Sequence, residues 1–219
     1  MRRKDAAAGS RVCNHSGVSS NDSYGDGLER LLQPPQIFTR TEVLNRPCPI
    51  PATAGVYAWY FTQVPPGVPT DRCHSLDGSH LLYVGISPKA PSRDGLKSRQ
   101  NLRTRVRYHF RGNAAGSTLR LTLGSLLAVQ IGIGLRRVGS GQRLTFSSGE
   151  AELSQWMGDH ARVCWAETAT PWLLESRLIE RLTLPLNLDQ NKHSGFHEQL
   201  RVARADQRAV ARELEVLPR

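Results

Sequence analysis

The chain has 219 residues, 39% of them hydrophobic, and this length favours one globular domain with extensions over two domains. It has no run of about 18 apolar residues that could cross a membrane, and no apolar segment follows the N-terminal MRRK as in a secretory signal, so we expect a cytoplasmic protein. The net charge of +10 favours a nucleic acid over an anionic membrane as partner, because the basic segment lacks a broad apolar face.

The N-terminal segment carries little that could form a core. Residues 1–27 are rich in Ser, Asn, Gly and Ala, so they cannot bury enough surface to offset the entropy of ordering, and we predict a disordered tail. Residues 28–54 hold two proline clusters, which predicts an extended arm with one short helix. Partial zinc ligation is one interpretation of four scattered residues, and free thiols with loop histidines are the alternative: Cys48, Cys73, His74 and His80.

Two β-rich segments follow the arm. GVYAWYF at 55–61 and HLLYVGI at 80–86 predict two strands, joined by a long loop at 62–79 that carries Pro, Gly, Asp and Ser. Tyr57 and Tyr83 each stand close to a glycine, and two tyrosines on one face of a hairpin can be neighbours. Ordinary cross-strand aromatic packing is the alternative explanation for both.

A helix is predicted from about Ser98 to Arg111. Leu102, Val106 and Phe110 recur every four residues and form its core-facing stripe. Arg105 and His109 are also four residues apart, so they share a face at the boundary between core and surface and could hold a phosphate together. The alternatives are a solvated arginine and a structural histidine.

The remaining elements follow from caps and apolar periodicity. We predict a helix from Ser117 or Thr118 to about Gln130, a strand or hairpin at 135–147, a helix from Ser148 to about His160, a strand at 162–167, and a final helix from Phe196 to Leu214. On the final helix, Arg201, Arg204, Arg208 and Arg212 are expected on exposed sides.

A further helix, at about 170–182, holds the most informative single residue. Thr170 can cap it and Pro171 suits its first turn. On a helical wheel Glu175 lies within the apolar face, beside Leu178 and Ile179. A carboxylate on a buried face is costly unless it is paired, so Glu175 predicts either a metal ion or a buried salt bridge.

Basic residues are concentrated in one block. Between Gly95 and Gly149 the sequence has many Lys and Arg but no Asp or Glu. Such a block is an electrostatic footprint for a polyanion, and the alternative is a solvated surface that keeps the protein soluble. We predict that nucleic-acid phosphates are contacted by Lys97, Arg103, Arg107, Arg111 and Arg120.

Four segments in order resemble the GIY-YIG nuclease superfamily: GVY at 55–57, YVG at 83–85, NLRTRVRYHF at 101–110 and LLESRLIERLTLPLN at 173–187. His109 is typical of its restriction endonuclease branch. The resemblance implies six site residues: Tyr57, Tyr83, Arg105, His109, Glu175 and Asn187. It covers about residues 53–190, and the long separation between Arg105 and Glu175 indicates an insertion at about 112–165.

The resemblance implies an α+β fold, with a small mixed sheet flanked by helices, for a domain at 55–190 followed by a helical extension at 191–219. It also implies one Mg²⁺ or Mn²⁺ held by Glu175, and Arg105 on the scissile phosphate. A tyrosine with a pKa lowered by nearby cations would take a proton from water, His109 would relay it, and Asn187 would position the tyrosine or the phosphate. Asn191 and His193 are secondary candidates.

The implied substrate is DNA, and a restriction enzyme would act on it as a homodimer. One alternative is a repair or branch-cutting nuclease. Another is a nucleic-acid-binding module that has lost activity, although the complete set of six candidate residues argues against it. A basic structural protein would explain the charge but not Glu175.

Overall fold

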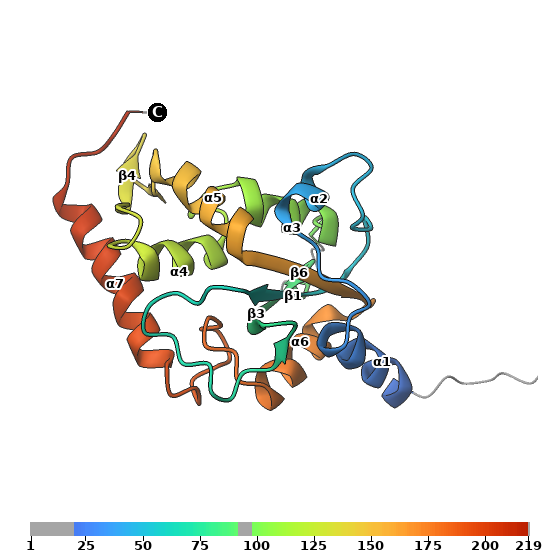
Figure 1. Cartoon of the computed structure of the whole chain (residues 1–219). Helices are drawn as coiled ribbons and strands as arrows, with labels where there is room; N and C mark the ends of the chain where they lie inside the picture. The colour runs from blue at the N-terminus through green and yellow to red at the C-terminus, as the bar shows by residue number, and fades with distance from the viewer. Residues whose placement is uncertain (1–19, 92–97, 219) are drawn as a thin grey trace, which may run out of the picture.

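The computed structural model describes residues 20–91 and 98–218, and its centre is a four-stranded antiparallel sheet in the order β2-β3-β1-β6 (Figure 1). The strands are β1 at Gly55–Phe61, β2 at Ser75–Leu76, β3 at Ser79–Ser87 and β6 at Ala161–Glu167. The strands predicted at 55–61, 80–86 and 162–167 are confirmed, and so is the α+β fold class.

Helices and a small hairpin surround the sheet. They are α1 at Ser20–Leu32, α2 at Arg40–Leu44, α3 at Leu102–Arg111, α4 at Thr118–Leu127, β4 at Arg136–Val138, β5 at Arg143–Thr145, α5 at Gly149–His160, α6 at Pro171–Arg181 and α7 at His197–Glu213. Each helix predicted from residue 98 onward is present, with ends shifted by a few residues. None of the described helices is long and apolar enough to span a membrane.

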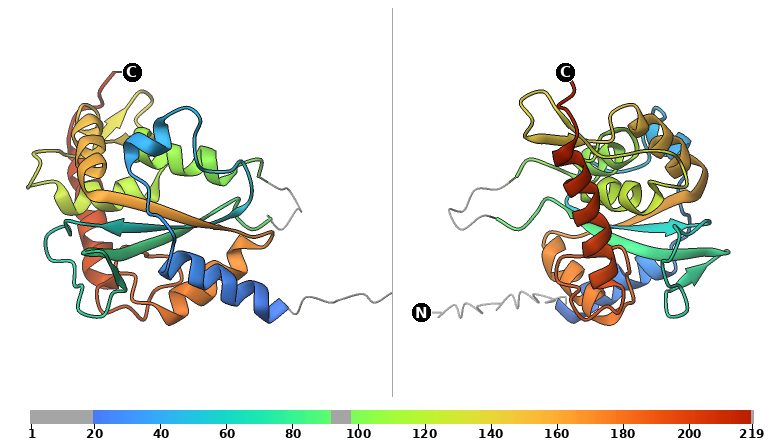
Figure 2. Two further views of the ribbon diagram at one scale, coloured as in Figure 1. Left: turned by 45° about the vertical axis from the view of Figure 1, so that its right-hand side comes forward. Right: turned by 90° about the vertical axis from the view of Figure 1, so that its left-hand side faces the viewer.

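Strand β1 is buried on both faces, and its alternate residues face different layers of helices. Tyr57 and Trp59 belong to one core, which α3 and α5 cover. Val56 and Ala58 belong to a second core, which α1 and α6 cover. Figure 2 shows the two layers on opposite sides of the sheet. The layers matter for function because the candidate site draws on both.

Helix α1 corrects the predicted tail. Residues 1–19 of that prediction lie outside the described part of the chain, but from residue 20 on the chain is helical. Leu31 at the end of α1 is fully buried, and its carbonyl accepts a 2.7 Å hydrogen bond from the hydroxyl of Tyr60 on β1. The prediction was wrong for residues 20–27, which form the beginning of α1. The apolar side chains through which α1 packs lie in its last turns, beyond the segment whose composition was considered.

The predicted arm at 28–54 begins with the last residues of α1, which the prediction did not include, but it contains the expected short helix, α2, and is anchored to α3. Arg103 donates from Nε to the carbonyl of Ile50 at 2.7 Å, and Arg107 donates to the carbonyl of Val43 at 2.8 Å. Val43 and Ile50 are themselves fully buried. The arm is therefore part of the core, and it covers one flank of α3.

The predicted insertion at 112–165 is too long at its C-terminal end. Strand β6 pairs with β1 along its whole length, from Ala161 opposite Phe61 to Glu167 opposite Gly55. It therefore belongs to the central sheet. The part of the range that lies outside this sheet consists of α4, the β4–β5 hairpin and α5, and α4 packs against α7.

Candidate active site

A cavity of about 390 Å³ opens beside β3, where the segment after α6 runs along the strand. The predicted site residues that line it are Tyr57, Tyr83, Arg105, Glu175 and Asn187. The sixth, His109, is fully buried behind Tyr57. Strands β1 and β3, helices α3 and α6 and the segment after α6 thus bring together residues that are far apart in the sequence.

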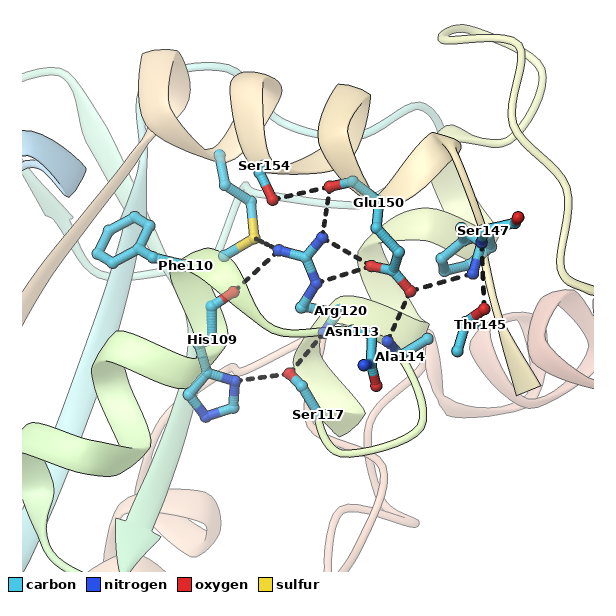
Figure 3. A network of polar contacts seen from close by, with 12 residues as sticks. His109, Phe110, Asn113, Ala114, Ser117, Arg120, Thr145, Ser147, Glu150 and Ser154 are labelled. Carbon is cyan, nitrogen blue, oxygen red and sulfur yellow. Dashed lines mark hydrogen bonds and ion pairs between the residues drawn. The ribbon is translucent and has the colours of Figure 1, made fainter. Parts of the chain in front are cut away.

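Tyr57 and His109 form a buried polar pair. The Tyr57 hydroxyl lies 2.8 Å from Nε2 of His109. Nδ1 of His109 lies 2.7 Å from Oγ of Ser117, a contact that Figure 3 shows. Burial lowers the pKa of His109 well below its ordinary value, and the charges of Arg105 and Arg120 add to the effect. The imidazole is therefore neutral, with one donor and one acceptor nitrogen. Such a ring can exchange a proton with the Tyr57 hydroxyl.

The glycine of YVG at 83–85 has a steric reason. Gly85 lies opposite Tyr57 in the register of β1 and β3. A Cβ atom at Gly85 would lie 2.6 Å from the Tyr57 hydroxyl oxygen and 2.7 Å from Cζ. Only glycine therefore lets the tyrosine ring cross the neighbouring strand and keep its contact with His109.

The pKa values of the two tyrosines correct the expectation that nearby cations lower them. Burial raises the pKa of Tyr57, and the proximity of Tyr83 raises it further. Burial likewise raises the pKa of Tyr83, whose hydroxyl is 3.3 Å from Oγ1 of Thr118. Arg105 lowers both values, but loss of solvation outweighs its charge. Both tyrosines are therefore neutral before substrate binds.

Glu175 is half-buried and makes no ion pair with a described side chain. The predicted alternative of a buried salt bridge is therefore wrong for the described part of the chain. Burial raises the pKa of Glu175 to about 7, and the charge of Asp189 contributes in the same direction. A carboxylate in this state gains from a cation that enters the cavity.

Asn187 uses its side-chain amide to hold the sheet. Its Oδ1 accepts from the backbone N–H of Val84 and its Nδ2 donates to the carbonyl of Val84, both at 2.9 Å. This amide fixes the backbone next to Tyr83, and the contacts it makes are with β3. Whether Asn187 also positions a phosphate stays a prediction. Asn191 is buried and donates to the carbonyls of Leu184 and Asn187. His193 lines a different cavity.

Arg105 projects from α3 into the cavity. It is half-buried, and one of its terminal nitrogens donates to the carbonyl of Gly116 at 2.7 Å. The guanidinium has further N–H donors, and the cavity is also lined by Lys89. With Arg204, which also lines the cavity, three cations share it with the carboxylates of Glu175 and Asp189. This arrangement suits an anionic ligand that carries a divalent metal.

The residues predicted to contact nucleic-acid phosphates differ in how exposed they are. Arg111 is exposed at the end of α3, and Lys97 lies outside the described residues. Arg103 and Arg107 donate to backbone carbonyls of the arm, and Arg103 remains exposed while Arg107 is half-buried. Arg120 is fully buried, so its prediction as a nucleic-acid contact is wrong.

Arg120 instead organises a buried network below the site (Figure 3). Its guanidinium binds the Glu150 carboxylate at 2.7 and 2.9 Å and donates to the carbonyl of His109 at 3.1 Å. The same carboxylate accepts from the backbone N–H groups of Ala114 and Phe146. The network holds the turn that presents the Gly116 carbonyl to Arg105.

Three charged residues of the cavity wall were missed by sequence reasoning, namely Lys89, Asp189 and Arg204. Asp189 and Lys89 lie in loops, which carry no periodic signal. Arg204 was expected on an exposed side of the final helix, but it is half-buried and faces the site.

Among the described residues, no group of three or more His, Cys, Asp or Glu is placed to hold a metal, which leaves the zinc interpretation without a ligand set.

The buried state of His109 has a consequence for stability that can be measured. Its pKa is lowered in the folded protein. Near pH 6.5 the imidazole therefore binds a proton in the unfolded chain but stays neutral in the folded one. Its stabilising contribution is present above pH 6.5 and is lost as the pH falls below it, by up to about 1.4 kcal/mol per pH unit. We expect the free energy of unfolding in urea to fall less between pH 7 and pH 5 in His109→Gln than in the wild type.

The control for this prediction is His193→Gln, which changes an exposed histidine. Its free energy of unfolding should depend on pH as that of the wild type does. Equal pH dependence of His109→Gln and the wild type would show that the buried imidazole is not held neutral.

The comparisons with known proteins agree with this geometry. The family model described as the GIY-YIG catalytic domain matches residues 55–206. That range contains every side chain predicted for the site and ends within α7. The comparisons with curated proteins and with solved structures gave no match. Because the family match covers more than half of the chain, this protein belongs to the GIY-YIG nuclease superfamily.

Proposed function

We propose that this nuclease is a Mg²⁺- or Mn²⁺-dependent endonuclease that hydrolyses DNA at specific sequences, as a restriction enzyme does. One observation carries the proposal. Glu175, a half-buried carboxylate without an ion-pair partner among the described residues, faces the same cavity as Arg105 and the Tyr57–His109 pair. A metal-binding group, a phosphate-binding group and a proton acceptor are thus in one place.

The residues of the cavity fit a hard divalent cation. Mg²⁺ prefers carboxylate oxygens, keeps several waters and is held by one or two carboxylates together with substrate phosphates. Glu175 would hold the ion, and Asp189 adds negative charge in the same cavity. A metal bound there would polarise the scissile phosphate and stabilise the departing 3′ oxygen.

The protein's own groups account for the other parts of the reaction. Arg105 donates to the scissile phosphate and offsets the charge that develops on it. Tyr57 accepts a proton from the attacking water while its own proton passes to Nε2 of His109, 2.8 Å away. This transfer requires the tautomer in which Nδ1 carries the hydrogen and donates it to Ser117. Because burial raises the pKa of Tyr57 and lowers that of His109, a separate transfer between them is unfavourable, and the transfer to His109 has to accompany the attack.

The test is cleavage of supercoiled and linear DNA with Mg²⁺ by the wild type, Glu175→Gln and Glu180→Gln. Glu180 is exposed on the same helix, so its replacement removes an equal charge outside the cavity. We expect Glu175→Gln to lose metal-dependent cleavage and to keep DNA binding, while Glu180→Gln retains both.

The products distinguish the remaining alternatives. Discrete fragments that are absent with Glu175→Gln would establish a sequence-specific nuclease, for which a homodimer on palindromic DNA is then expected. Nicking, or cutting only of branched or damaged DNA, would indicate a repair enzyme. Metal-independent binding without cleavage by the wild type would contradict the proposal and leave a binding module.

A further inference from the structure

A second cavity adjoins the active site and is strongly basic. It has a volume of about 520 Å³ and shares Lys89, Arg105 and Arg204 with the first cavity. Arg208 completes its cationic lining, and none of the described residues that line it is acidic. Residues at the N-terminus of α4 also line it, where the helix dipole favours an anion. The first cavity, in contrast, contains two carboxylates.

Arg204 is on α7, and its side chain lines both cavities. This helix packs against α4 and runs across one end of the sheet (Figure 2). Arg204 is half-buried, and its Nε is buried without a hydrogen-bond partner among the described residues. The ion pairs in the described part of the chain involve neither Arg204 nor Arg208. A desolvated guanidinium with an unsatisfied donor is costly unless a ligand supplies the acceptor.

The electrostatic surroundings of Arg204 also favour an anionic ligand. Burial lowers its pKa, and the neighbouring charge of Arg208 lowers it further. Asp189 acts in the opposite direction but makes no ion pair with Arg204. The two arginines therefore repel each other across a cavity that contains no carboxylate from the described chain. An anion placed between them would relieve both the repulsion and the lost solvation.

We propose that Arg204, with Lys89 and Arg208, binds a DNA backbone phosphate next to the scissile one. This subsite rests on the proposed function for the identity of its ligand. Arg105 lies between the two cavities, so a strand whose scissile phosphate meets Arg105 and Glu175 would continue into the basic cavity. Because phosphate contacts carry no sequence information, Arg204 would set the position of the strand and its affinity.

The test measures DNA binding in a Glu175→Gln background, where cleavage does not interfere. Arg204→Met keeps the apolar stem and removes the charge, and Arg204→Lys keeps a charge. The control is Arg201→Met on the same helix, because Arg201 is 56% exposed and already paired with Glu198. Binding of a duplex is followed by fluorescence anisotropy between about 50 and 300 mM salt, and thermal unfolding verifies that each variant is folded.

We expect Arg204→Met to weaken binding about tenfold or more at low salt and to reduce the slope of log K against log salt by about 0.9. Arg204→Lys should restore the slope, and Arg201→Met should leave slope and affinity close to those of the parent. With Glu175 present, Arg204→Met should raise KM more than it lowers kcat.

Equal slopes for Arg204→Met and Arg201→Met in folded proteins would overturn the subsite, and so would the absence of any DNA binding. Failure of the proposed function has a different signature. The wild type would then not cleave DNA with Mg²⁺, while the salt slope of Arg204→Met would still be lower than that of its parent and would support the phosphate subsite.

Discussion

Replacing Glu150 by alanine is expected to lower the free energy of unfolding by about 3–5 kcal/mol, because it leaves a buried arginine without its counter-charge. Arg120 is fully buried and donates two short hydrogen bonds to the Glu150 carboxylate. The backbone N–H groups of Ala114 and Phe146 would lose their acceptor as well. Thermal unfolding should show a midpoint lower by about 6–20 °C.

Glu152→Ala is the matched control, since Glu152 is exposed in the same first turn of α5. It should change stability by less than about 0.5 kcal/mol. The double variant Arg120→Met, Glu150→Met should be more stable than either single variant, because no uncompensated charge then remains buried. A Glu150→Ala variant as stable as Glu152→Ala would refute the structural role of the pair.

Replacing Tyr57 by phenylalanine is expected to lower kcat by about 10²–10⁴-fold with little change in KM, because it removes the group that receives the proton from water. The ring and its packing remain, and the lost hydrogen bond is the one to His109. Single-turnover cleavage of a DNA duplex with saturating Mg²⁺ measures the effect, and thermal unfolding verifies that the variant is folded.

Two further variants test the assignment to Tyr57. Tyr83→Phe removes a hydroxyl whose contact is with Thr118, and it should lower kcat by less than Tyr57→Phe does. Gly85→Ala keeps both tyrosine hydroxyls, but its Cβ would lie 2.6 Å from the hydroxyl oxygen of Tyr57. It should therefore also lower kcat. A larger loss with Tyr83→Phe than with Tyr57→Phe would transfer the role of proton acceptor to Tyr83.

Much of the fold follows from patterns that lie within single elements. The β-rich composition of β1 and the apolar stripe of α3 are local, and so is the wheel position of Glu175, which the structure places in the wall of the cavity. Ser117 caps α4 with its own side chain, as predicted, whereas α3 is capped by Asn101 and begins a few residues after the predicted start near Ser98. Local patterns thus predicted which elements form and which face is buried, and their ends to within a few residues.

Whether a given arginine is buried or exposed could not be predicted from such local patterns. Whether Arg120 is buried depends on Glu150, which comes from another helix, and Arg204 faces the site because α7 packs on α4. Charge alone therefore misassigned both residues to exposed surfaces. The tyrosine pKa values were mispredicted for a related reason, since burial by the whole fold outweighs one neighbouring cation.

The two layers of helices contribute different parts of the chemistry. Arg105 and His109 come from α3, which covers one face of the sheet, while Glu175 comes from α6 on the other face. During synthesis, a growing chain that has emerged only as far as α5 lacks the carboxylate, and one that ends at α6 lacks Asn187 and the segment that closes the edge of β3. All six predicted site residues are therefore present together only after the chain has been synthesised and folded through Asn187.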